Sequence, residues 1–246
     1  MQHVIEEILA CAPHGSAAEL ARRAGVNRST LHRIATGKVE PSLGTLRALA
    51  IVSGLDLTIS LEPLSDPDAA AAARYLLDAA SAQLALTEGA RAWVDRLERV
   101  AGGPLEVLPV AAQASTLLAR KGTALFRGDS SAARLASAGD GADGQWAISG
   151  RAAIELGRDM PLSGPSVLWV DDVDRAGGIL AVTHDRVTTS ANAQVIVAEV
   201  NASVLVDAYA VGPLRYVAPI QMLLDCVGLG GQLEAAALDI AKEWSQ

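Results

Sequence analysis

The strongest constraint on the fold is a pattern of helix, sharp turn and helix, followed by a third helix, in residues 16–53. Ser16 and Glu19 have the spacing of a capping box, in which each side chain binds a free amide at a helix start. Gly25 can supply the left-handed conformation that ends this helix and turns the chain sharply. We therefore expect a second helix to begin within a few residues of the first, at a large angle to it.

The second helix of this pattern has one apolar and one polar side. Asn27 is suited to cap its first turn. Leu31 and Ile34 share the apolar side, where they can pack against neighbouring helices. The polar side carries side chains that can donate hydrogen bonds outward: Arg28, Ser29, His32 and Arg33. The helix is thus predicted to pack through one side and to leave the other free for a partner.

The first 64 residues resemble the helix-turn-helix domains of the Cro and phage-repressor (XRE) family. The matching positions are Glu19-Leu20-Ala21, Gly25-Val26, Ser29-Thr30-Leu31, Gly37-Lys38, Pro41-Ser42 and Thr45-Leu46. In this family the second helix of the motif enters the major groove, with its N-terminal residues at the base edges. The resemblance therefore implies a domain that binds duplex DNA.

Two sets of DNA contacts follow from this resemblance, position by position. The residues implied to lie at the bases are Arg28, Ser29 and Arg33, with Thr30 and His32 close by. Arginine suits guanine because its planar guanidinium donates to O6 and N7 together, which gives about 1–3 kcal/mol of discrimination. The residues implied to lie near phosphate are Ser16, Ala17, Arg22, Arg23, Asn27 and Lys38.

The charge distribution favours this interpretation over a small helical bundle with a solvated basic face. Residues 22–38 contain five Lys or Arg and no Asp or Glu, whereas residues 1–64 contain six residues of each sign. The remainder holds fourteen basic and twenty-two acidic residues, which accounts for the whole net charge of −8. Because an acidic remainder repels DNA, we expect binding through the basic surface and a steep dependence on salt.

Composition indicates which kind of nucleic acid the chain can bind and in which cellular compartment it is expected. Aromatic residues are only 3% of the chain, which disfavours stacking on the bases of RNA or single-stranded DNA. Cys11 and Cys226 have no partner spacing, and the sequence has no secretory signal pattern and no apolar run near 20 residues. We therefore expect a reduced, cytoplasmic protein without a membrane partner.

The order of the patterns predicts an α+β multidomain protein. An all-α helix-turn-helix head at 1–64 is followed by a helical connector at 65–103 and a mixed α/β domain at 104–246. The connector has a second interpretation, as a dimerisation helix. In the head, apolar residues between Val4 and Leu9 predict a first helix, and alternation from Leu55 to Leu61 predicts a strand that pairs with the body or across a dimer.

Helical and strand patterns alternate within residues 104–246. Helices are expected at 110–119, 131–137, 150–156, 220–227 and 233–244. Strands are expected at 123–127, 145–149, 166–170, 194–199 and 204–209.

Three segments of this region resemble the C-terminal part of AbiEi-type antitoxins, which belong to type IV toxin–antitoxin systems linked to phage defence. They are residues 146–153 (WAISGRAA), 167–171 (VLWVD) and 216–231 (YVAPIQMLLDCVGLGG). The N-terminal DNA-binding domain of that family is usually a winged helix, and this chain has an XRE-like helix-turn-helix in its place. This difference leaves the operator geometry and the oligomeric state open. The resemblance implies that the body counteracts a nucleotidyltransferase-like toxin, without any need for direct contact.

Several short segments match catalytic or ligand-binding motifs by residue type, but the sequence around them does not fit those motifs. Asp171, Asp172 and Asp174 could hold a divalent metal, but aspartate is also a turn and cap residue after a strand, which we favour. Residues 139–144 (GDGADG) spell a dinucleotide loop without the strand before it and the helix after it, so we expect a surface loop. His184-Asp185 is interpreted as a surface turn, and the histidines lack zinc-ligand spacing. With no nucleophile elbow or Walker sequence, we expect no catalytic residue, metal or cofactor.

Together these patterns predict a sequence-specific DNA-binding repressor that acts as the autoregulating antitoxin of a type IV pair. Its partners are then double-stranded operator DNA and, functionally, a nucleotidyltransferase-like toxin, and a homodimer on the operator is left open. One alternative is a stand-alone transcriptional regulator whose body senses a ligand or dimerises. The other is a nucleotide-processing enzyme built on the three aspartates.

Overall fold

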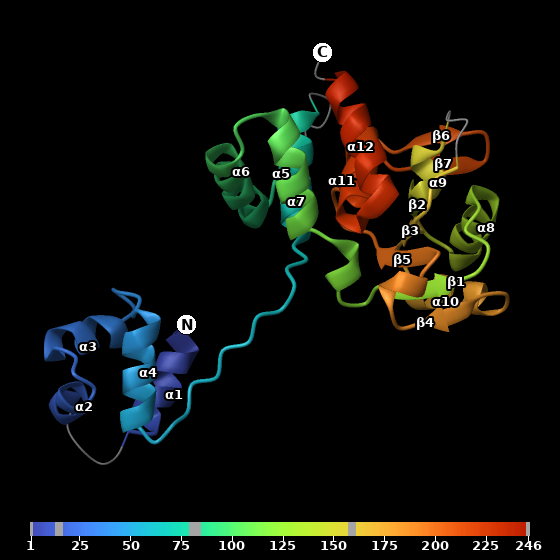
Figure 1. Cartoon of the computed structure of the whole chain (residues 1–246). Coiled ribbons are helices and arrows are strands. Elements are labelled where there is room, and N and C mark those ends of the chain that lie inside the picture. The colour runs from blue at the N-terminus through green and yellow to red at the C-terminus, as the bar shows by residue number, and fades with distance from the viewer. Residues whose placement is uncertain (1, 13–16, 79–84, 157–160, 245–246) are drawn as a thin grey trace. The chain divides into compact units, whose positions relative to one another are not determined.

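A computed structural model describes residues 2–12, 17–78, 85–156 and 161–244, and the chain divides into two compact units, Met1–Glu62 and Pro63–Gln246 (Figure 1). The described part of the first unit is built from helices, and the second combines helices with a mixed sheet. The predicted fold class, α+β with an N-terminal helix-turn-helix, is therefore confirmed.

The first unit packs its helices around one small apolar core. These helices are α1 (Gln2–Ala10), α2 (Ala17–Arg23), α3 (Arg28–Ala35) and α4 (Leu43–Val52). The core consists of Ile5, Ile8, Leu20, Ala21, Leu31, Ile34, Leu46, Leu49 and Ala50. Burying each large aliphatic side chain contributes about 1.5–3 kcal/mol, so a handful of them can hold short helices that would not be stable alone.

Within this chain, residues 55–61 do not form the predicted strand. Residues 55–66 have neither helical nor ladder hydrogen bonding in the described structure. Leu55 and Leu57 pack partly against the core of the first unit, whereas Ile59 and Leu61 are 55% and 96% exposed. Alternation of apolar and polar residues indicates an extended chain with two different faces. A β-strand also needs a neighbouring strand for its backbone hydrogen bonds, and no described residue provides one.

The second unit begins with helices and ends with helices. They are α5 (Pro67–Leu77), α6 (Glu88–Val100), α7 (Pro104–Ala114), α8 (Ala132–Ala142), α9 (Arg151–Ile154), α10 (Val173–Ala181), α11 (Pro219–Leu229) and α12 (Gly231–Trp244), with short 3-10 turns η2 (Leu117–Ala119) and η3 (Ser190–Asn192). The strands are β1 (Ala124–Arg127), β2 (Trp146–Gly150), β3 (Ser166–Val170), β4 (Asp185–Val187), β5 (Val195–Glu199), β6 (Tyr209–Val211) and β7 (Leu214–Tyr216). The three-residue strands β4 and β7 escaped prediction because they are too short to show alternation.

The described strands form one mixed sheet in the order β4-β1-β5-β3-β2-β7-β6. β3 pairs with β5 in parallel and with β2 antiparallel, so the apolar centre of the sheet carries both kinds of pairing. Every residue of β2 and β3 is buried, because both faces of the sheet are covered. α8 and α10 cover one face, where Ile148 and Leu168 point, and Ala147, Val167 and Trp169 point to the other.

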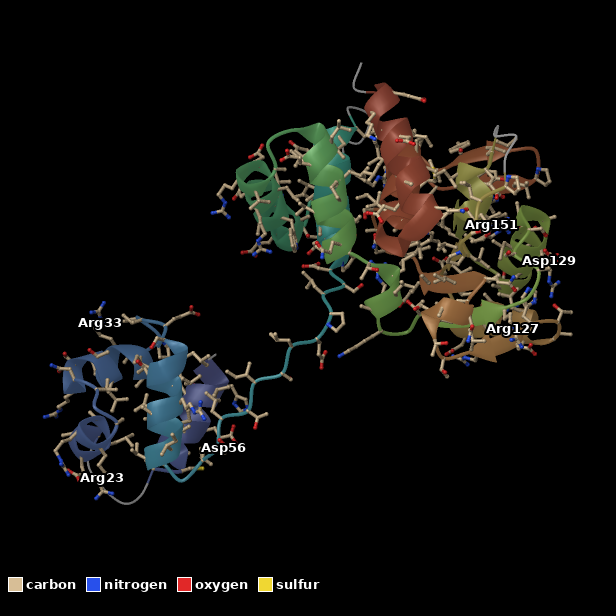
Figure 2. The ribbon with its side chains drawn as sticks, in the orientation of Figure 1. Arg23, Arg33, Asp56, Arg127, Asp129 and Arg151 are labelled. Atoms are coloured by element: carbon tan, nitrogen blue, oxygen red, sulfur yellow. The ribbon has the colours of Figure 1, made fainter. Side chains whose placement is uncertain are left out.

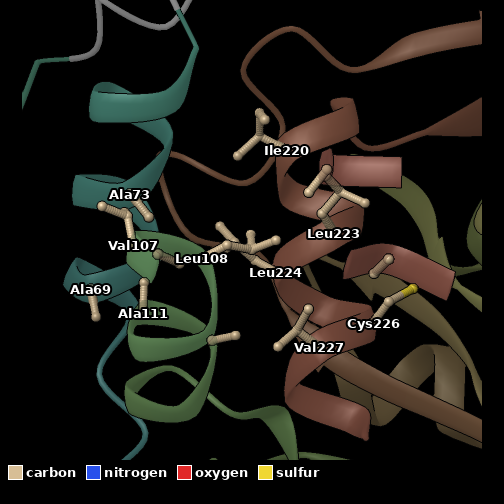
Figure 3. Close-up of a cluster of buried hydrophobic side chains, with 14 of the residues drawn as sticks. Ala69, Ala73, Val107, Leu108, Ala111, Ile220, Leu223, Leu224, Cys226 and Val227 are labelled. Atoms are coloured by element: carbon tan, nitrogen blue, oxygen red, sulfur yellow. The ribbon is translucent and has the colours of Figure 1, made fainter. Parts of the chain in front are cut away.

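A cluster of buried apolar side chains joins α5, α7 and α11 (Figure 3). Ala69, Ala72 and Ala73 of α5 are fully buried in it, together with Leu108 of α7 and Leu224 of α11. α6 joins through Trp93 and Leu97. The two helices that lie in the segment expected to be a connector, α5 and α6, thus contribute to the core of the second unit.

The strand predicted at residues 204–209 is wrong over most of its length. Residues 202–207 form tight turns, and β6 begins only at Tyr209. The fully buried Arg74 of α5 donates hydrogen bonds to the carbonyls of Ser203 and Val206. Asn201 Oδ1 accepts from the amides of Ser203 and Val204 at 3.0 and 3.2 Å. These bonds occupy backbone groups that a ladder would need, so the apolar run cannot become a strand.

Two further local predictions are corrected. Residues 139–144 are not a surface loop: Gly139 is a buried part of α8 that lies against the Trp146 ring, and the helix ends only at Ala142. His184 is not in a surface turn, since it is buried and its Nε2 lies 2.8 Å from the Asp129 carbonyl. The Trp146 ring covers Gly139, and a backbone carbonyl 55 residues earlier accounts for the burial of His184.

Candidate nucleic-acid interface

The turn between α2 and α3 is fixed by one left-handed glycine and by local hydrogen bonds. Gly25 has φ +67°, and the Val26 amide donates to the Ala21 carbonyl at 2.9 Å, which closes α2. Asn27 then caps α3, because its Oδ1 accepts from the Ser29 amide at 3.0 Å. The predicted turn and cap are confirmed, and they set the angle between the two helices.

One side of α3 is buried and the other is exposed. Leu31 and Ile34 are 2% and 1% exposed, which fixes the rotation of the helix about its axis. Of the residues implied to read bases, four are exposed: Arg28, Ser29, His32 and Arg33. Thr30 is half-buried, so it has less surface to offer. Figure 2 shows Arg33 projecting outward from the first unit.

The two arginines of α2 are held by an acidic residue of the same helix. Glu19 accepts hydrogen bonds from Arg22 Nη2 and Nε at 2.7 and 2.9 Å and from Arg23 Nε at 2.8 Å. The hydrogen bonds from Arg22, and then those from Arg23, lower the pKa of the Glu19 carboxyl to about 2. The three side chains therefore carry a net charge of +1 and not +2 at neutral pH. Arg22 and Arg23 follow Glu19 by three and four residues, and residues at this spacing are neighbours on a helix surface. The sequence therefore carries a local signal for this ion-paired cluster.

Three further described residues implied to contact phosphate lie at or just beyond the ends of α2 and α3: Ala17, Asn27 and Lys38. Ala17 is the exposed first residue of α2, and Ser16 lies outside the described residues. The Asn27 side-chain oxygen is engaged in the cap, so a phosphate contact would have to come from its amide nitrogen. Lys38 is exposed, and its amide donates to the Arg33 carbonyl at 2.8 Å, so the backbone next to this lysine is fixed to α3.

The three aspartates after β3 lie where the chain turns from strand to helix. Asp172 caps α10 by accepting from the Arg175 amide at 2.9 Å, and Asp171 Oδ2 accepts from the Gln145 amide at 2.7 Å. Asp174 is exposed in the first turn of α10. Within the described ranges, no three His, Cys, Asp or Glu side chains gather as a metal site would require. Asp171 and Asp172 thus have partners of the kind that turn and cap residues use.

Among the described residues of the second unit, Asp225 of α11 is the buried carboxylate. It accepts from Trp169 Nε1 and Gln221 Nε2, both at 2.9 Å. Burial raises the pKa of the Asp225 carboxyl, although the hydrogen bonds from Trp169 and Gln221 and the nearby Arg120 charge oppose that rise. The carboxylate thus joins α11 to β3 in the interior.

The second unit also has a surface hollow. It measures about 520 Å³ and lies between α5, the start of α6 and the turns at 201–207. Its lining is mainly small and apolar, with Ala71, Ala90 and Val206, and two acidic residues, Asp68 and Asp207, border it. A hollow of this size and character could hold a small molecule.

Comparison with known proteins supports the assignment of the first unit. Residues 15–58 match a family model described as a helix-turn-helix domain. No curated protein and no solved structure matches the chain. The protein is therefore an α+β protein with an N-terminal helix-turn-helix domain, a class whose expected partner is DNA. Among the described helices, none is long and apolar enough to cross a membrane.

Proposed function

We propose that the protein is a sequence-specific repressor that reads an operator in duplex DNA through α3. The observation that carries this proposal is the exposed row of Arg28, His32 and Arg33 on a helix whose other side is locked in the core by Leu31 and Ile34. A recognition helix must hold its side chains in a fixed frame, since a bidentate contact to guanine depends on the angle of the guanidinium.

Charge supports the same assignment. The first unit has a basic surface, while most of the acidic residues lie in residues 65–246. Repulsion between DNA and the acidic unit favours encounters in which the basic surface meets the duplex. The repressor would therefore bind DNA through the head and use the remainder for another task.

We propose, more specifically, that the second unit makes the protein the autoregulating antitoxin of a type IV pair. The three segments that resemble AbiEi-type antitoxins supply the support, and they are neighbours in the fold. β2 pairs with β3 along its whole length, and α11 packs on β2. The resemblance thus covers one contiguous core and not three unrelated stretches.

Selection from a pool of random duplexes tests the first part. Full-length protein should enrich one motif, and a reporter that carries this motif in its promoter should be repressed when the protein is expressed. Recovery of duplexes with no shared sequence would contradict an operator-reading role.

Co-expression tests the antitoxin part. A nucleotidyltransferase-like toxin encoded beside this gene should arrest growth, and this protein should restore it. Full toxicity in the presence of the protein, or the lack of such a neighbouring gene, would remove the antitoxin role and leave the repressor role intact.

A second candidate, a stand-alone regulator that responds to a small molecule, rests on the hollow of about 520 Å³ beside α5. Replacing Ala71 with Trp would fill this hollow. If a metabolite pool stabilises the wild type against heat but not the Ala71→Trp variant, the result favours a ligand-responsive regulator over an antitoxin.

We propose no catalysis by Asp171, Asp172 and Asp174, so their Asn variants should respond to Mg²⁺ and nucleotide as the wild type does.

A further inference from the structure

A second hollow, of about 400 Å³, lies where β6 and β7 form one edge of the sheet (Figure 1). It shares no lining residue with the hollow beside α5. Its lining combines aromatic and apolar residues with side chains that can donate hydrogen bonds, and includes Gln145, Trp146, Leu205, Ala208, Tyr209 and Arg215. Apolar walls with a few polar groups are the usual character of a small-molecule site.

The sheet fixes the position of Arg215 at this hollow. Arg215 of β7 lies opposite Ala210 of β6, and β7 also pairs in parallel with β2. The guanidinium carbon of Arg215 lies 5.6 Å from the centroid of the Trp146 ring, at the start of β2. A cation is attracted to the face of an indole ring, so Trp146 supports the guanidinium.

The Trp146 ring is itself held firmly. It is 3% exposed, and its Nε1 donates to Asp140 Oδ1 at 2.9 Å. Gly139 of α8 lies so close to the ring that an added Cβ would meet it at 2.6 Å. The ring therefore cannot move far toward α8, and Arg215 rests on a fixed support.

Arg215 also keeps its donors available. Other arginines of this unit form ion pairs with carboxylates at 2.8, 3.0 and 3.7 Å, namely Arg127, Arg151 and Arg175. Arg215 is exposed and forms no ion pair in the part of the chain that the structure describes, although acidic residues outnumber basic ones in this unit. A guanidinium presents its N–H groups as a planar fork that matches the two oxygens of a carboxylate.

Tyr209 supplies a further donor and an aromatic wall. Its ring stacks on that of Tyr216, with centroids 5.8 Å apart, and Tyr216 is only 1% exposed. Tyr209 remains 39% exposed beside the hollow. Burial raises the pKa of the Tyr209 phenol, so its hydroxyl stays protonated at neutral pH and can donate.

We propose that this hollow binds a small aromatic carboxylate, whose two oxygens take the fork of Arg215 and whose ring lies against Tyr209 and Leu205. Tyr209 and Gln145 are the additional donors for the oxygens. A flat ring suits walls that are aromatic and apolar, whereas a bare inorganic anion would gain nothing from them. The site does not depend on the DNA-binding role.

Isothermal titration of the full-length protein tests the ligand class with three probes: benzoate, benzamide and inorganic phosphate. Benzoate should bind saturably at one site. Benzamide keeps the ring and loses the charge, and phosphate keeps a charge and loses the ring. Each should bind at least about tenfold more weakly, because one loses the charged hydrogen bonds and the other the apolar contact.

Substitutions test the location. Arg215→Gln should weaken benzoate binding at least about tenfold, and Ala208→Phe should abolish it by occupying the hollow. The matched control Arg186→Gln loses the same charge from an exposed position on β4, at the opposite edge of the sheet. It should leave the dissociation constant within about twofold. Arg215, Ala208 and Arg186 are exposed, so circular dichroism should show the same fold in all three variants.

No saturable benzoate binding by the wild type would overturn the proposal. Equal affinity for benzoate and benzamide, or for benzoate and phosphate, would overturn the ligand class. Full benzoate binding by Arg215→Gln, or an equal loss in Arg186→Gln, would overturn the location. Because operator selection uses a different unit, benzoate binding without any selected DNA motif would contradict the repressor role and leave this site intact.

Discussion

Replacing Glu19 with Gln tests whether α2 lies against DNA phosphate. In the wild type, Glu19 accepts three hydrogen bonds from Arg22 and Arg23, so this group of three side chains carries +1. Glutamine removes the negative charge and raises the group to +2. Each further phosphate that a cation neutralises steepens the plot of log K against log salt by about 0.9, so we expect a change of about that size in the Glu19→Gln variant.

A change of pH cannot substitute for this variant. The hydrogen bonds from both arginines lower the pKa of Glu19 from 4.5 to about 2. The stabilising contribution of the pair is therefore complete above pH 4.5 and is lost only as the pH falls through about 2. Across the range used for DNA binding, the carboxylate stays charged and the arginines stay paired.

Fluorescence anisotropy of a labelled duplex, titrated at several salt concentrations, measures the slope. Glu7→Gln on α1 is the matched control, because it is exposed and loses the same charge at a position without predicted DNA contacts. Equal slopes for Glu19→Gln and the wild type, or equal steepening in both variants, would refute the placement of Arg22 and Arg23 at phosphate.

Substitutions at three other positions probe the scaffold by chemical denaturation. Gly25→Ala should cost about 1–2 kcal/mol from the left-handed backbone alone, because no atom lies within 4 Å of an added Cβ, and Gly25→Asn should cost less. Leu31→Ala should cost about 2–5 kcal/mol and weaken DNA binding by loosening α3, whereas unchanged stability would place this side chain outside the core. Asp225→Ala should cost about 1–3 kcal/mol for each donor left unpaired on Trp169 and Gln221. Because burial raises the pKa of Asp225, protonation of this carboxyl favours the folded state. Its contribution to wild-type stability is complete below the ordinary pKa of aspartate and declines as the pH rises through the raised pKa of the folded state. The Asp225→Asn variant should not show this decline.

Local signals were sufficient for the helix-turn-helix. Gly25 and Asn27 act through their own backbone and the next two residues, so sequence alone could locate the turn and the cap. The buried side of α3 followed from helical spacing because Leu31 and Ile34 meet a core on one side only. The pairing of Glu19 with two arginines is equally local, because residues three and four positions apart are neighbours on a helix surface.

Errors arose where a distant partner decides the outcome. Residues 55–61 and 204–209 both look like strands, yet the first finds no neighbour in the described chain and Arg74 bonds the backbone of the second into turns. The run Ala69–Ala73 gave no sign of which domain it joins, because alanine packs against any close surface. Burial of His184 depends on a carbonyl 55 residues earlier, which no local pattern reveals.

The direct test of the central claim is the preference of the full-length protein for its selected motif over random duplex, measured at one salt concentration for three variants. Arg28→Ala and Arg33→Ala should each lower this preference by about 1–3 kcal/mol, because each would lose a base contact. Lys38→Ala should weaken binding to both duplexes alike and flatten the salt slope by about one unit. An unchanged preference in both arginine variants would show that α3 does not read the bases.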